Sequence, residues 1–193
     1  MTEKQAHIAA TVKLSNAAAT KQVNVKVTVK DHDKTIQEIK RHVTLNAHSE
    51  GETIIPFTIQ NPRLWNGRED PFMYRAEISL WENDKLLDKV IQPLGIRYYR
   101  VDPDNGFFLN GKHLPLYGVC RHQDRAEIGN ALRSMHHEED TELMLEMGVN
   151  AVRLAHYQQA EYMYDLMDQS GIITWAEIPF VGPGGSVSYT HLR

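Results

Sequence analysis

Several features that mark particular classes of protein are missing from this 193-residue sequence. Its single cysteine, Cys120, excludes an internal disulfide, and one thiol gives no evidence for either redox compartment. No apolar run approaches the roughly 20 residues that a membrane-spanning helix needs. The net charge is −4, from 21 basic and 25 acidic residues, and no Lys/Arg run occurs. Neither nucleic acid nor a membrane is therefore expected as a partner.

Signals of targeting and of common catalytic motifs are also missing. The amino terminus, Met1–Gln5, has no apolar segment of the kind found in a secretory signal, although this says little if the chain is a fragment. The sequence has no HExxH motif, no Cys pair, no Gly-rich phosphate loop and no nucleophile elbow. The compartment stays open, and the hydrophobic fraction of 41% predicts an ordinary soluble globular chain.

The first hundred residues contain strand patterns and no convincing helix. Val23, Val25, Val27 and Val29 alternate with polar residues, which puts one face of a strand inward and the other in water. Further strands are predicted at His7–Leu14, Ile36–Leu45, Thr53–Ile59, Tyr74–Trp81 and Leu86–Gln92. Strands of this length and spacing predict an immunoglobulin-like β-sandwich over residues 1–102, although no Cys-Trp-Cys signature supports an antibody-type domain.

After residue 102 the pattern changes to alternating strands and helices. Asn110-Gly111 between two apolar runs predicts a hairpin, because both central residues of a type I′ turn need positive φ. Helices are predicted at 138–147, with Leu143 and Met147 on one face and Met144 beside them, and at 160–170, with Met163, Leu166 and Met167. Gly148 and Gly171 follow these helices, where a left-handed residue is favoured.

Three short apolar runs each end in ionisable side chains. They are Leu116–Cys120, Ala151–Ala155 and Ile172–Ala176, and the two predicted helices separate them. Strand, helix, strand, helix, strand is the order of a parallel sheet, and it opens either a doubly wound sheet or a (β/α)₈ barrel. In such sheets ligands bind at the carboxyl ends of the strands, so the residues there are the candidate site.

Two arginines and two histidines are the first candidates. Arg121 and Arg153 lie in or directly after apolar strands, so we expect each to pair with a carboxylate inside the barrel. This pairing fits a structural role as well as direct substrate contact. His122 and His156 occupy equivalent positions after neighbouring strands and should converge on one pocket, where imidazole can bind a hydroxyl group, transfer a proton or ligate a metal.

Two carboxylates and one aromatic ring complete the candidate set. Asp124 and Glu177 are suited to hydroxyl recognition or to holding the arginines. Trp175 offers an aromatic face for an apolar sugar surface, with core packing as the alternative. A metal held by His122, His156 and Glu177 is the chemical rival. The remaining histidines, His136 and His137 among them, are expected to be solvated at the start of a helix.

At Gly118–Asp124 the chain resembles glycoside hydrolase family 2, which contains β-galactosidases and β-glucuronidases. The resemblance extends over essentially everything before Gly185. The other segments that carry it are Asn61–Trp65, Pro71–Tyr74, Gly95–Arg97, Phe108–Lys112, Asn150–Tyr157, Tyr164–Asp168 and Trp175–Pro179. It implies an immunoglobulin-like sandwich followed, at residues 103–185, by the first three strands of a truncated (β/α)₈ TIM barrel.

The activity implied by the resemblance is that of a retaining exo-β-glycosidase. The pattern is most similar to the β-galactosidase branch, so a terminal β-galactoside is the expected substrate, with β-glucuronidase or β-mannosidase as alternatives. The family's two catalytic glutamates do not lie in this chain, which is therefore expected to be inactive alone. Arg121 and Arg153 match the family's site arginines, His122 and His156 its substrate-facing histidines, and Glu177 its acidic residue after the third strand.

Some expectations concern the whole protein or the end of the chain. No cofactor is expected, because residues 178–183 lack the magnesium ligands of some β-galactosidases, and a homo-oligomeric parent is left open. Residues 186–193 match one reading frame of a common tagmentation adapter and are predicted to be non-native. A non-catalytic sandwich that binds carbohydrate or protein remains the alternative from another functional class.

Overall fold

A computed structural model describes residues 4–179, and the chain divides into two compact units. The first unit consists of Met1–Trp65 and Phe72–Tyr99, and the second of Asn66–Pro71 and Arg100–Arg193. The predicted non-native tail at 186–193 lies outside the described residues. No helix among the described residues is long and apolar enough to cross a membrane.

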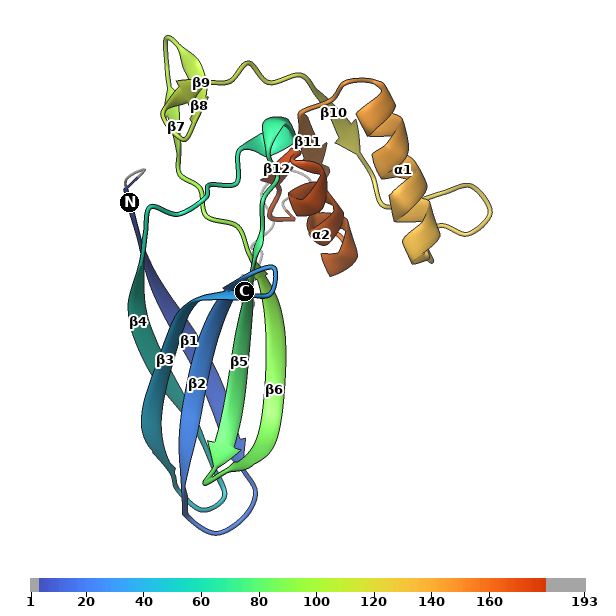
Figure 1. The fold of residues 1–193 in the computed structure, drawn as a ribbon. Helices are drawn as coiled ribbons and strands as arrows, with labels where there is room; N and C mark the ends of the chain where they lie inside the picture. Colours follow the sequence, from blue (N-terminus) through green and yellow to red (C-terminus); the bar gives the residue numbers. More distant parts are fainter. Residues whose placement is uncertain (1–3, 180–193) are drawn as a thin grey trace. The chain divides into compact units, whose positions relative to one another are not determined.

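The first unit is the predicted β-sandwich (Figure 1). Strands β1 and β4 form one antiparallel sheet, and the other sheet has the order β3-β2-β5-β6. All six predicted strands are confirmed, each with slightly wider bounds. The strands are β1 (Gln5–Asn16), β2 (Lys21–Asp31), β3 (Lys34–Leu45), β4 (Ser49–Gln60), β5 (Tyr74–Glu82) and β6 (Lys85–Leu94), with a 3₁₀ turn η1 (Gly67–Glu69) between β4 and β5.

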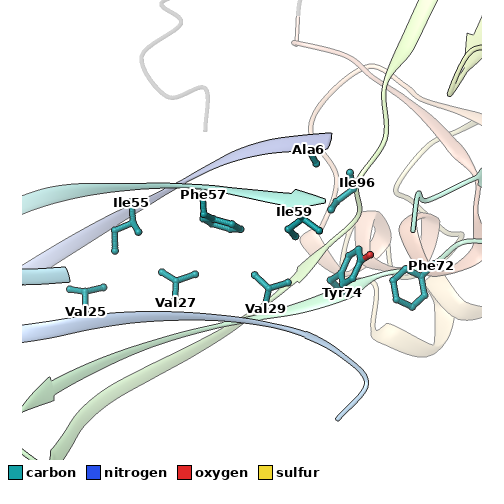
Figure 2. Close-up of a cluster of buried hydrophobic side chains, with 10 residues drawn as sticks. All are labelled: Ala6, Val25, Val27, Val29, Ile55, Phe57, Ile59, Phe72, Tyr74 and Ile96. Carbon is teal, nitrogen blue, oxygen red and sulfur yellow. The ribbon is translucent and has the colours of Figure 1, made fainter. Parts of the chain in front are cut away.

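The core of the sandwich lies between β2 and β4 (Figure 2). Val25, Val27 and Val29 of β2 point toward the other sheet, as their alternation predicts, and all three are buried. Ile55, Phe57 and Ile59 of β4 face them. Each fully buried side chain of this kind stabilises the fold by roughly 1.5 to 3 kcal/mol through the removal of apolar surface from water.

After the sandwich strands the chain forms a small sheet of β7 (Tyr99–Asp102), β8 (Gly106–Leu109) and β9 (Lys112–His113), which belongs to the second unit from Arg100 onward. Asn110 and Gly111 connect β8 to β9 with φ values of 50° and 82°, which are the positive values that a type I′ turn requires. The predicted hairpin is confirmed.

The remainder of the second unit is a three-stranded parallel sheet with two helices. The elements are β10 (Gly118–Arg121), α1 (Ser134–Glu146), β11 (Ala151–Leu154), α2 (Glu161–Ser170) and β12 (Ile173–Ala176). The strand order β10-β11-β12 follows the sequence, so the described part of the chain contains the start of a (β/α)₈ barrel and not a closed one.

The buried face of α2 is apolar, whereas that of α1 is largely polar. Helix α2 buries Met163 and Met167 as predicted, but the prediction for α1 was wrong, because Leu143 and Met147 are 53% and 69% exposed. Helix α1 instead buries two polar residues together with Met144. Gly148 and Gly171 follow the helices with φ values of 75° and 72°, which confirms the predicted left-handed ends.

Candidate functional site

Three of the predicted site residues form one cluster at the carboxyl ends of β11 and β12. Arg153 donates its Nε–H to Oε1 of Glu177 at 2.7 Å. Nδ1 of His156 lies 3.0 Å from Oε2 of Glu177 and 3.0 Å from a terminal nitrogen of Arg153. The backbone carbonyl of Glu177 accepts a further hydrogen bond from the amide of Gln158. A guanidinium, an imidazole and a carboxylate therefore orient one another. The His156 side chain follows a cis peptide bond between Ala155 and His156.

Whether Nδ1 of His156 donates or accepts a hydrogen bond depends on whether it carries a proton. When Nδ1 carries a proton, it donates to Glu177, and when Nδ1 is bare, it accepts from Arg153. Both arrangements use the same geometry, so the ring keeps its orientation in either state. Nε2 of the imidazole is left as the atom that can meet a ligand.

Glu177 is held as a carboxylate in this cluster. Burial alone would raise its pKa, but the hydrogen bonds and charges of Arg153 and His156 outweigh burial, and the pKa is lowered below its ordinary value. Since the anion is the favoured form near neutral pH, Glu177 is suited to accept hydrogen bonds and unsuited to donate a proton.

His122 packs against this cluster from the end of β10. Its ring centroid is 5.3 Å from that of His156, with the ring planes at 73°, and 6.3 Å from the ring of Tyr157. The two imidazoles predicted to converge therefore lie edge to face, and His122 is exposed to solvent.

An open pocket of about 410 Å³ lies over the ends of β11 and β12. Its lining includes Arg153, His156, Glu177 and Trp175, and the Trp175 side chain is 70% exposed. In the described chain this tryptophan presents its ring to solvent, although core packing was the alternative. Polar donors beside an aromatic face suit a ligand that is rich in hydroxyl groups and apolar on one side.

Arg121 does not join this cluster: it pairs with a carboxylate as predicted, but with Asp140 of α1 and not inside the barrel. Its side chain is buried, and it lies beside Leu154 on the face of the sheet that packs against the helices. Nε and a terminal nitrogen of Arg121 donate to Oδ2 of Asp140 in α1 at 2.9 and 2.7 Å. Arg121 therefore ties β10 to α1, which is a structural role.

His137 was also predicted incorrectly, since it is buried and not solvated. Burial and the nearby charge of Arg121 lower the pKa of His137, so the ring is neutral near pH 7 and Nδ1 accepts from Arg121 at 3.0 Å. His137, Asp140, Thr141 and Met144 occupy positions i, i+3, i+4 and i+7, which lie on one helix face. This spacing was the available sequence signal, and it was missed because polar residues were not counted as buried.

The remaining candidates lie apart from the cluster. Asp124 is exposed in the loop after β10, and no hydrogen bond or ion pair within residues 4–179 joins it to Glu177 or His156. In the same part of the chain no three His, Cys, Asp or Glu residues are grouped closely enough to hold a metal ion. This includes the trio of His122, His156 and Glu177 considered from the sequence.

Comparisons with known families cover both units. Residues 1–97 match the family model described as glycosyl hydrolases family 2, and residues 101–191 match the TIM barrel domain of glycosyl hydrolases family 2. The boundary between the two matches falls close to the change of pattern seen in the sequence.

Individual relatives support the same assignment. A β-glucuronidase of Bacteroides fragilis is 63% identical over 182 residues, which are 94% of this chain and 26% of the relative. A β-galactosidase of Bacteroides ovatus is 29% identical over 91% of this chain and 21% of its own length. The crystal structure of a Bacteroides uniformis β-glucuronidase superposes with a TM-score of 0.89 at 34% identity, covering 95% of this chain and 23% of that one. The chain thus spans about a quarter of the length of these relatives.

Proposed function

Because the chain belongs to glycoside hydrolase family 2, we propose that it forms the substrate-orienting side of the active site of a retaining exo-β-glucuronidase. The observation that carries this proposal is the 63% identity to a β-glucuronidase over 94% of the chain. The β-galactoside predicted from the sequence has weaker support, since the β-galactosidase of Bacteroides ovatus is 29% identical and the structure of a putative β-galactosidase of Bacteroides fragilis is 38% identical at similar coverage. We therefore propose the glucuronide, which was the alternative, as the substrate.

The cluster supplies binding groups for one sugar ring. His122 and His156 would hydrogen-bond sugar hydroxyls through their ring nitrogens, and Trp175 would cover an apolar face of the ring. Arg153 and Glu177 hold His156 in place and add charged groups at the rim of the pocket. Each of these residues acts by orientation, which can lower a reaction barrier by fixing the substrate in a reactive position.

We assign no proton transfer to Glu177. Retaining glycosidases use one carboxyl group as acid and base and a second as nucleophile, about 5 to 5.5 Å apart. Glu177 is tied to Arg153 and His156 in its ionised form and cannot serve as the acid that protonates the leaving group. The 193-residue chain alone should therefore not hydrolyse a chromogenic β-glucuronide or β-galactoside, and turnover above the blank would contradict this assignment.

A graft into the Bacteroides fragilis β-glucuronidase tests the proposed activity. The matching 182-residue segment of that enzyme is replaced by the segment of this chain. We expect kcat/KM for para-nitrophenyl β-D-glucuronide to stay within about tenfold of the parent enzyme, with the preference over the galactoside retained. A folded chimera that prefers the galactoside, or that is inactive on both substrates, would refute the glucuronidase proposal.

A second chimera carries His156→Ala and tests whether the cluster takes part in sugar binding. If His156 binds the sugar, its kcat/KM should fall by about 100-fold. Met135→Ala, which removes an exposed side chain from α1, should leave the activity of the chimera unchanged.

A further inference from the structure

The two residues on either side of His122 are both bound to one segment, Tyr157–Ala160, which connects β11 to α2. His122 itself is exposed and lies directly after β10, where an unrestrained loop would let its ring sample several positions. Four hydrogen bonds to this segment hold Arg121 and Gln123, two through their backbone groups and two through their side chains.

On the amino-terminal side, Arg121 and Gln159 form a reciprocal pair. The amide nitrogen of Gln159 donates to the backbone carbonyl of Arg121 at 2.9 Å, and its amide oxygen accepts from the Arg121 guanidinium. Both residues are buried, so the pair is shielded from competing water. The carbonyl adjoining His122 also accepts the backbone N–H of Ala155 at 3.0 Å, so Gln159 is the second of two donors that fix it.

On the carboxyl-terminal side, Gln123 makes two bonds to the same segment. Its backbone N–H donates to the hydroxyl of Tyr157 at 3.1 Å, and its Oε1 accepts the backbone N–H of Ala160 at 2.6 Å. Ala160 is the N-cap residue of α2, and its own N–H has no partner within the helix, so Gln123 supplies an acceptor for it from the neighbouring loop.

We propose that Tyr157, Gln159 and Gln123 are positioning residues that hold the His122 ring edge to face with His156, so that both imidazoles address one sugar. The sugar-binding part of this inference rests on the proposed function. Tyr157 contributes to this positioning in two ways. Its hydroxyl accepts the backbone N–H of Gln123, and its ring lies beside the ring of His122. The positioning residues themselves need no contact with the sugar.

Imidazole NMR spectra of the full 193-residue chain test the geometry without any sugar. Tyr157→Phe keeps the ring and removes only the acceptor of the Gln123 N–H, so we expect the His122 resonances to shift and its cross-peaks to His156 to weaken. The matched control is Tyr162→Phe, which removes a phenol bond to Glu138 between α2 and α1 and should leave His122 unchanged. Unchanged His122 resonances in Tyr157→Phe would overturn the proposal.

Gln123 provides a rescue experiment. Gln123→Ala removes the acceptor of the Ala160 N–H and should displace His122, whereas Gln123→Glu keeps an acceptor at the same place and should restore the wild-type His122 resonances. The methyl resonances of Met163 and Met167, both buried under α2, report whether each variant is folded. Equal His122 spectra for Gln123→Ala and the wild type would contradict the positioning role.

Titration with methyl β-D-glucuronide distinguishes failure of the proposed sugar binding from failure of the proposed positioning of His122. We expect Tyr157→Phe to weaken binding by about tenfold relative to the wild type and to Tyr162→Phe. If the wild-type chain does not bind the sugar while Tyr157→Phe still shifts His122, the proposed function fails and the positioning role stands. If Tyr157→Phe binds the sugar as tightly as the wild type, the positioning role fails and the proposed function stands.

Discussion

Glu177 accepts a hydrogen bond from Nε of Arg153 at 2.7 Å, across the neighbouring strands β12 and β11. Arg153 and Trp175 are register partners in these strands, and Cys120 is the partner of Arg153 on β10. The ion pair therefore lies at the rim of the pocket, on the sheet face that does not pack against the helices. This position makes it relevant to ligand binding more than to folding.

Glu177→Gln should weaken sugar binding while leaving the fold largely intact. The substitution removes the anion that orients Arg153 and His156, so we expect affinity for methyl β-D-glucuronide to fall by about tenfold. Stability should change little, because both partners are partly exposed and exposed ion pairs contribute little. Titration and urea unfolding measure the two effects. Glu38→Gln, which breaks a surface pair with Lys26 at 3.1 Å, should not affect sugar binding.

Acid should destabilise the sandwich through Glu77. Hydrogen bonds from Lys30, Lys89 and Arg75 outweigh burial and lower the pKa of Glu77 to about 2, from an ordinary value of 4.5. Since the pKa is lower in the folded state, this stabilisation is complete above about pH 4.5 and is lost as the pH falls toward 2. Thermal unfolding of the chain between pH 7 and pH 2 should show the loss.

Glu77→Gln tests the source of this acid sensitivity. The variant should lose about 2 kcal/mol at pH 7, because three cations remain around a neutral amide, and its stability should depend less on pH. Glu52→Gln, at an exposed position of β4, serves as the control and should keep the pH dependence of the wild type. A Glu77→Gln variant as acid-sensitive as the wild type would exclude this carboxylate as the cause.

Gly171→Ala and Gly148→Ala should differ sharply although both glycines end a helix with similar φ. At Gly148 an added Cβ meets no atom within 4 Å, so only the left-handed backbone is penalised, by about 1 to 2 kcal/mol. At Gly171 the added Cβ would overlap the backbone carbonyl of Gly67, so the cost should be clearly larger. Urea unfolding of the two variants gives the comparison, and equal losses would show that the close approach to Gly67 is not rigid.

Arg121→Lys should destabilise the second unit even though it keeps the charge. A lysine ammonium cannot reproduce the planar set of donors that reaches Asp140, Gln159 and His137 together. We expect a loss of about 3 kcal/mol in denaturant unfolding, since buried partners are left without donors. Arg125→Lys is the control, because Arg125 contacts the same Asp140 from a more exposed position and should matter little. Similar stability of the two variants would argue against a central role for Arg121.

Periodicity made the sandwich predictable, because each β2 valine alternates with a polar residue and strand alternation fixes which face is buried. The hairpin at Asn110-Gly111 was predictable for an equally local reason, the need for positive φ. The burying face of α1 was not, because His137 and Thr141 count as polar in any hydropathy pattern. His137 is buried against Arg121, which lies on another element, and the Thr141 hydroxyl donates a hydrogen bond to the His137 carbonyl.

The side to which the Arg121 side chain points was also not predictable from the sequence. Alternation along β10 places Arg121 on the face opposite Cys120, but nothing local says which face meets the helices. Only the register with Leu154 on β11, which packs against Met163 and Met167, resolves this. The two histidines were predicted to converge from equivalent positions, but the pairing of Arg121 with Leu154 puts His156 one residue further beyond its strand than His122. Their rings nevertheless meet edge to face.

The segment Asn66–Pro71 follows β4 in the chain but belongs to the second unit. Within that unit Arg68 donates to the backbone carbonyl of Val149 at 2.7 Å, and the backbone of Gly67 packs against Gly171. An exchange of gene segments near residue 100 would therefore bring a foreign loop to the base of the parallel sheet. Successful recombination between members of this family should keep the loop and the barrel segment from the same parent.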